Sequence, residues 1–184
     1  MTLLRRPRPV RLGLALALSA GLLGSCGVSS DESVPWCEPD GRLAIMAQSV
    51  PTAAYVPCVA ELPTGWSFDE LAVDDDGARF TLESDRADRA VQVQLTSRCD
   101  VGEATPISPS DEGVRTYHFV TSIQPRYAGR LLDVFPGGCV VTRYDFERGP
   151  HVALVTELQA AIGLFTRLEL RHALEADLGV RLDP

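Results

Sequence analysis

The 184-residue chain contains no lysine, and all 17 of its basic residues are arginine. We interpret this as a GC-rich coding bias rather than selection for guanidinium chemistry. The first 25 residues contain no acidic residue, whereas the rest holds 13 arginines against all 25 acids, a net charge of −12. Such an acidic body excludes nucleic-acid binding, which needs a cationic face, and attraction to anionic lipid headgroups.

No apolar run is long enough to form a transmembrane helix. The longest, residues 12–23, is shorter than the roughly 20 residues that a helix needs to cross the hydrocarbon core. It follows a basic segment, residues 1–11, and this order of basic and then apolar residues is typical of a secretory signal peptide. We therefore expect export rather than a membrane-spanning anchor.

The end of the apolar run carries the most specific motif in the chain. The sequence Leu23-Gly24-Ser25-Cys26 resembles the lipobox of bacterial lipoproteins, in which a branched apolar residue and two small residues precede a cysteine. The resemblance implies lipidation of Cys26 with diacylglycerol, cleavage before it and further acylation, for example with palmitate. Several acyl chains give stable anchoring. The chain would then be held at the extracytoplasmic face of the cell membrane.

Two other export signals are alternatives to the lipobox. An ordinary signal peptide with a chance cysteine is one, and a twin-arginine signal at Arg5-Arg6 is the other, although no apolar residues follow that pair directly. The predicted organisation is a signal peptide at 1–25, a lipidated cysteine with an acidic tether at 26–35, and one globular domain at 36–184. The domain resembles only uncharacterised lipoproteins of actinobacterial type, which implies no activity.

Setting Cys26 aside leaves an even number of cysteines, Cys37, Cys58, Cys99 and Cys139. In an exported domain this predicts two disulfides. Of the three possible connectivities we favour Cys37–Cys58 and Cys99–Cys139, because neighbouring segments most often pack together. A zinc site is the rival interpretation, but none of these cysteines are near neighbours. No metal or other cofactor is predicted.

The hydrophobic pattern predicts an α+β fold, a mostly antiparallel meander with a C-terminal helical hairpin packed on one face. Residues 43–50 suggest a strand or short buried segment, and alternation predicts strands within 66–96 and 114–146. Residues 100–113 read as a long loop. A helix is expected from Pro150 to Gly163, and a second after the capping box Thr166–Glu169, ending near Gly179.

Several familiar sites are missing or better explained otherwise. There is no nucleophile elbow, phosphate loop or zinc-protease helix motif. The run Asp74–Gly77 suits a hairpin turn better than a calcium site, because its spacing is wrong for an EF-hand. His118, His151 and His172 do not cluster in sequence, and alternation turns His118 away from its two aromatic neighbours.

The one candidate ligand site is a predicted loop carrying Arg126, Tyr127 and Arg130. Paired guanidinium groups can capture a carboxylate or phosphate, although ion pairing with the surplus acids is the more common outcome. We assign no catalytic residue.

These observations favour a non-enzymatic binding, interaction or sensor-like domain of the cell envelope, whose partner is an envelope protein or small ligand. The alternatives are a hydrolase of envelope carbohydrate or peptide, and a carrier of a lipid or small hydrophobic ligand. A hydrolase needs two converging carboxylates, and a carrier needs a dry apolar cavity under the helices. We expect no cleft with two carboxylates in catalytic reach and a strongly perturbed pKa.

Overall fold

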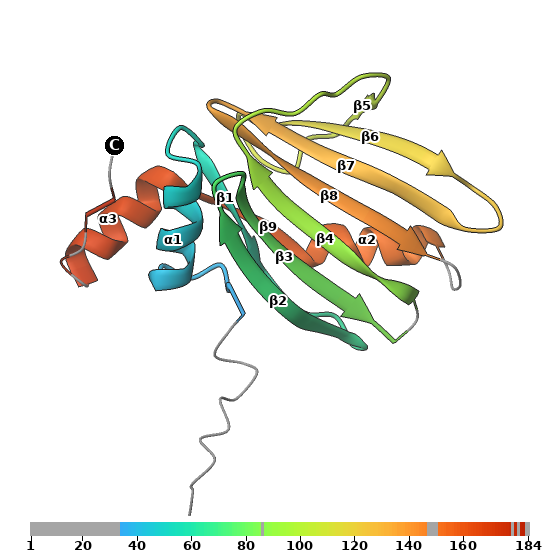
Figure 1. Cartoon of the computed structure of the whole chain (residues 1–184), viewed down its shortest axis with the longest axis horizontal. Coiled ribbons are helices and arrows are strands. Elements are labelled where there is room, and N and C mark those ends of the chain that lie inside the picture. The colour runs from blue at the N-terminus through green and yellow to red at the C-terminus, as the bar shows by residue number, and fades with distance from the viewer. Residues whose placement is uncertain (1–33, 86, 147–150, 178, 180, 183–184) are drawn as a thin grey trace, which may run out of the picture.

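The computed structural model confirms an α+β fold built on a seven-stranded antiparallel sheet (Figure 1). It describes residues 34–182 except 86, 147–150, 178 and 180. The elements are α1 (Gly41–Ser49), β1 (Tyr55–Val59), β2 (Trp66–Asp74), β3 (Gly77–Ser84), β4 (Ala87–Thr96), β5 (Thr105–Ile107), β6 (Arg115–Ser122), β7 (Tyr127–Phe135), β8 (Gly138–Phe146), α2 (His151–Ala161), β9 (Ile162–Thr166) and α3 (Arg167–Asp177).

The large sheet consists of two meanders joined side by side, in the order β2-β3-β4-β8-β7-β6-β5. After β4 the chain passes over the sheet to its far edge, and the second meander returns until β8 pairs with β4. The Asp74–Gly77 turn closes the β2–β3 hairpin, as predicted, with Asp76 N donating to Asp74 Oδ1 at 2.9 Å. Gly77 has a φ of +129°, and a Cβ there would lie 2.0 Å from Leu95 O.

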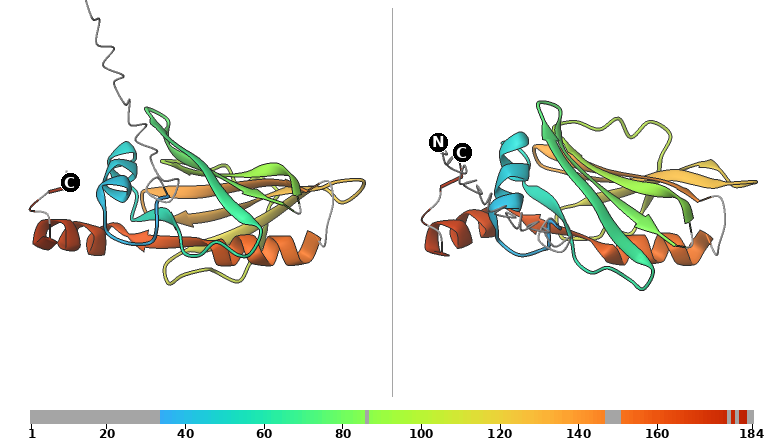
Figure 2. Two further views of the ribbon diagram at one scale, coloured as in Figure 1. Left: turned by 90° about the horizontal axis from the view of Figure 1, so that it is seen from below. Right: turned by 60° about the horizontal axis from the view of Figure 1, so that its bottom comes forward.

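The two faces of the large sheet differ in what covers them. Helix α2 lies along one face, and no helix lies on the other in the described part of the chain (Figure 2). The covered face holds the core, in which Phe80, Leu95, Phe146 and Leu158 are fully buried. On the open face, β4 presents half-buried polar residues instead. This alternation is typical of an antiparallel sheet with one wet side.

A two-stranded sheet, β1 with β9, lies against the covered side at one end of the large sheet, where β1 contacts β4 and β8 while α1 and α3 pack beside it (Figure 2). Cys37 and Cys58 form a disulfide there, with a Cα–Cα distance of 4.9 Å. Cys99 and Cys139 form the second disulfide, at 6.0 Å, and connect the segment after β4 to β8. Both predicted pairings are therefore confirmed. No helix in the described residues is long and apolar enough to cross a membrane.

Several local expectations need correction. The segment expected as a strand or short buried piece is helix α1, which begins because the Asp40 side chain accepts hydrogen bonds from Arg42 N and Leu43 N. The predicted long loop contains strand β5. The two C-terminal helices are present, but strand β9 separates them, so that α3 continues past the sheet instead of folding back over it (Figure 2).

The structure describes some, but not all, of the residues that were expected to begin and end the two C-terminal helices. The Thr166 capping box forms as expected, with Glu169 N donating to Thr166 Oγ1 at 3.2 Å. Gly179, expected to end α3, has a φ of +64°. The predicted start of the first helix, Gly149-Pro150, lies outside the described residues.

Candidate functional site

The open face of the large sheet brings together two arginines from neighbouring strands. Arg130 of β7 and Arg143 of β8 are direct partners in the antiparallel register. Their neighbours in the same transverse row are Phe119 on β6 and Gln92 on β4. Like charges placed directly opposite each other destabilise a sheet. The Arg130–Arg143 pair therefore does not contribute to folding stability, which points to a role in binding.

Arg130 is positioned by an aromatic ring. Its guanidinium carbon lies 5.2 Å from the centre of the Phe119 ring, a cation–π contact. The Arg130 Nε atom is buried and makes no hydrogen bond within the described part of the chain. An unsatisfied buried donor costs about 1–3 kcal/mol, and more if charged.

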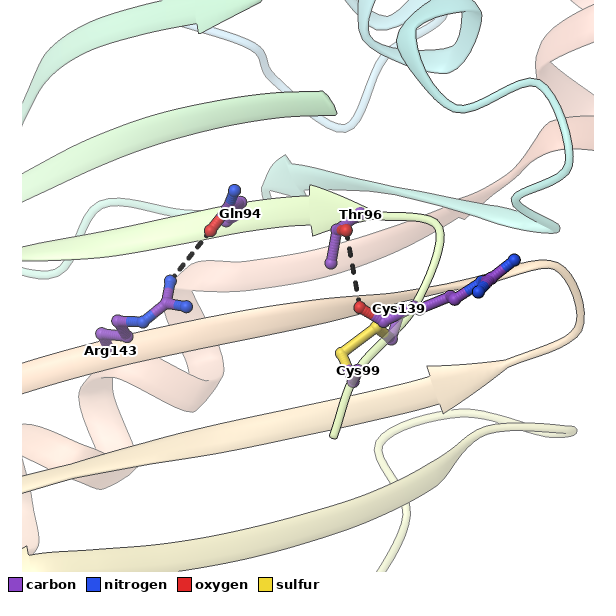
Figure 3. The surroundings of a disulfide bond; sticks show 6 residues. Gln94, Thr96, Cys99, Cys139 and Arg143 are labelled. Carbon is purple, nitrogen blue, oxygen red and sulfur yellow. Dashed lines mark hydrogen bonds between the residues drawn. A yellow bond between two sulfur atoms is a disulfide. The ribbon is translucent and has the colours of Figure 1, made fainter. Parts of the chain in front are cut away.

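Arg143 is exposed and is oriented by an amide. Its Nη1 donates to Gln94 Oε1 at 3.0 Å, and Figure 3 shows this contact between β8 and β4, next to the Cys99–Cys139 disulfide. Neither Arg143 nor Arg130 contacts a carboxylate within the described residues. In a chain with 25 acidic and 17 basic residues, two adjacent arginines without an ion pair are unexpected.

Two shallow depressions flank the arginine pair, and both arginines line each of them. The first is about 470 Å³, with Phe119 and Ala128 in its wall, and Asp145 is the one acid among the described residues that line it. The second is about 370 Å³ and adds Arg98, Asp76 and Asp100, near the disulfide. In each depression the described arginines outnumber the described acids by one, which suits an anionic ligand.

The predicted loop site is divided by the fold. Arg126 forms an ion pair with Asp145, with Nε to Oδ1 at 2.9 Å, and so neutralises the acid in the first depression. Tyr127 begins β7 and points to the covered face, stacked on Tyr144 and on His151 of α2, with ring centres 5.7 and 5.4 Å apart. Only Arg130 therefore reaches the open face at the arginine pair. Its partner Arg143 was not predicted, since it lies 13 residues further along the chain.

The histidines do not form a shared site. His118 Nε2 lies 2.5 Å from the Tyr144 hydroxyl on the covered face, and burial lowers the pKa of His118. Burial and the neighbouring Tyr127 raise the pKa of Tyr144 above its ordinary value. His172 is exposed on α3. In the described part of the chain, no three His, Cys, Asp or Glu side chains gather as they would around a metal ion.

A third cavity, about 380 Å³, lies on the covered face between β7, α2, β9 and the loop before β6. Asp133 and Asp111 both line it, and burial raises the pKa of Asp133. The expectation was that no cleft would combine two carboxylates in catalytic reach with a strongly perturbed pKa. This cavity does contain two carboxylates, and the pKa of one of them is raised. The cavity also has hydroxyl groups in its wall, so it is not the dry apolar cavity that a lipid carrier requires.

Comparison with protein-family models, with curated proteins and with solved structures found no match to this chain.

Proposed function

We propose that the protein is a lipid-anchored extracytoplasmic binding domain, and that the open sheet face takes an anionic ligand between Arg130 and Arg143. The observation that carries this proposal is their direct opposition across β7 and β8, with no carboxylate partner for either among the residues that the structure describes. A bound anion would offset the repulsion between the two guanidinium groups and accept their hydrogen bonds.

The cysteines support the proposed lipid anchor. The lipobox motif ends at Cys26, and the other four cysteines are paired in two disulfides. Disulfides persist in oxidising compartments outside the cytoplasm. Because these four cysteines are paired with one another, Cys26 is left without a disulfide partner among them, which supports its lipidation.

The chemistry of the site favours a carboxylate or phosphate group. Planar guanidinium groups hold these anions through two parallel hydrogen bonds each. The Phe119 ring and Ala128 beside the arginines would contact a less polar part of the same ligand. A membrane-tethered domain with this site would function as a receptor or sensor for a small envelope anion, or for an acidic segment of an envelope protein.

Anchoring is tested by labelling cells with alkyne palmitate and separating membranes from soluble material. We expect label and membrane retention for the wild type, and loss of both for Cys26→Ser. Ser29→Ala, in the tether, is the matched control and should behave as wild type. Palmitate labelling that persists in Cys26→Ser would contradict lipidation at this residue.

Anion binding is tested by thermal unfolding of the full chain, purified in detergent, in phosphate against chloride at equal ionic strength. A ligand that binds only the folded state raises the unfolding temperature with its concentration. We expect this rise for the wild type and for Arg115→Gln, an arginine of β6 outside both depressions. It should be lost in Arg130→Gln and Arg143→Gln. An equal rise in all four proteins would exclude the arginine pair as the site.

The hydrolase alternative has one observation in its favour, the third cavity with Asp111 and Asp133. A general acid needs a raised pKa, and burial raises that of Asp133. Asp111, however, is exposed in the loop before β6, so the two carboxylates differ in surroundings but lack the enclosure typical of catalytic pairs. Release of products from envelope glycan or peptide, abolished by Asp133→Asn, would establish hydrolysis in place of simple binding.

A further inference from the structure

Asp133 is a carboxylate on the core side of the sheet. Strand β7 alternates, and the positions of the same parity, Leu131 and Phe135, are buried in the core. An acid at such a position is costly unless it is hydrogen-bonded or has a ligand. Its placement therefore suggests a function for the cavity that it lines.

Hydrogen bonds satisfy only one oxygen of this carboxylate. Oδ1 accepts from Thr116 Oγ1 at 2.6 Å and from Ser110 Oγ at 3.3 Å. Ser110 N in turn donates to Thr116 Oγ1 at 3.2 Å, which holds the loop before β6 against the strand. Oδ2 has no hydrogen-bond partner among the described residues. It is also not among the buried unpaired atoms there, so it is open to the cavity.

The other residues that line the cavity determine the charge and the shape of the ligand that it can hold. Among the described residues, no arginine or histidine lines it, and Asp111 is its second titratable side chain. Opposite Asp133 stand three aliphatic side chains, Leu158 of α2 and Ile162 and Leu164 of β9. The volume of about 380 Å³ lies at the lower end of the range for small-molecule pockets, about 300–1,000 Å³.

We propose that this cavity binds a small organic ammonium ion, whose charged nitrogen donates to Asp133 Oδ2 while its aliphatic part packs on Leu158, Ile162 and Leu164. An ammonium group offers three donors and a positive charge, which the two carboxylates and the four hydroxyl-bearing side chains in the cavity wall complement. A purely hydrocarbon ligand would leave Oδ2 buried without a partner. A metal ion would find too few ligands, since no cluster of three metal-binding side chains exists in the described residues.

The experiment titrates the full chain in detergent, at pH 7, with linear primary amines of two to six carbons. The neutral alcohols of equal length are the matched ligands without charge. We expect the amines, and not the alcohols, to raise the unfolding temperature of the wild type. Asp133→Asn keeps an oxygen acceptor for Thr116 but loses the charge, and should weaken amine binding at least tenfold. Asp69→Asn, an exposed acid on β2, is the control and should bind as wild type.

A second readout does not depend on a variant folding correctly. The carboxyl carbon resonance of Asp133 reports its titration, and bound ammonium should move its raised pKa back toward the ordinary range. No effect of any amine on either readout would overturn the proposal, as would equal binding by Asp133→Asn. Arg143→Gln should bind amines normally, which separates this cavity from the anion site on the opposite face.

Discussion

Replacing Arg143 with glutamate should stabilise the fold while abolishing anion binding. The substitution removes a like-charge pair and creates an opposite-charge pair at the same register position, Arg130 with residue 143. Cross-strand pairs of this kind contribute roughly 0.2–1 kcal/mol each, so the combined gain should be about 0.5–2 kcal/mol. Such a gain is measurable against a typical stability of about 5–15 kcal/mol. The assay is urea unfolding followed by the fluorescence of buried Trp66.

Two controls isolate the electrostatic origin of this gain. Arg115→Glu introduces the same charge on the same face, but opposite the uncharged Val134, and should change stability much less. In 1 M salt the screening length falls to about 3 Å, so the gain from Arg143→Glu should shrink toward that of the control. A loss of stability in Arg143→Glu at low salt, or a gain equal to that of Arg115→Glu, would show that repulsion between Arg130 and Arg143 does not destabilise the fold.

Three further predictions concern the Cys99–Cys139 disulfide, the buried Asp133 and the cap of α3. Replacing Cys99 and Cys139 with serine should lower the free energy of unfolding by roughly 3.9 kcal/mol for a separation of 40 residues, as measured by urea unfolding; an unchanged midpoint would contradict this. Asp133→Asn should raise the free energy of unfolding at pH 7, because burial raises the folded pKa of Asp133 and its ionised form opposes folding. That difference should decline as the pH falls through the raised pKa and vanish below the ordinary value of 3.8; a constant difference would argue against titration of Asp133. Thr166→Ala should destabilise the chain by about 1 kcal/mol through loss of the cap on α3, with Thr156→Ala as an exposed control within α2.

Local signals predicted much of the fold, and the failures have physical causes. Alternation between apolar and polar residues predicted the strands of the large sheet except β5, and the capping box predicted the start of α3. Residues 43–50 were predicted wrongly because the prediction considered only their apolar run. The helix is set by its N-cap Asp40, which precedes that run. Strand β9 was missed because its partner β1 lies more than 100 residues earlier, and only that pairing makes it a strand.

The candidate sites were less predictable, because they depend on register between strands. The sequence placed Arg126, Tyr127 and Arg130 together as neighbours, but alternation along β7 sends Tyr127 and Arg130 to opposite faces. The partner of Arg130 comes from β8 and becomes visible only once the β7–β8 register is known. Asp133 was overlooked for the same reason, since the helix and strand that enclose it follow much later in the chain.

The most direct test of the anion site is the proton–nitrogen spectrum of the arginine Nε groups, recorded on the full chain in detergent during a phosphate titration at constant ionic strength. Assignment uses Arg130→Gln, Arg143→Gln and Arg115→Gln. We predict saturable shifts for Arg130, whose Nε is buried with no hydrogen-bond partner among the described residues, and for Arg143, with none for Arg115. Resonances of Arg130 and Arg143 that stay unmoved, or that move no more than that of Arg115, would contradict this prediction.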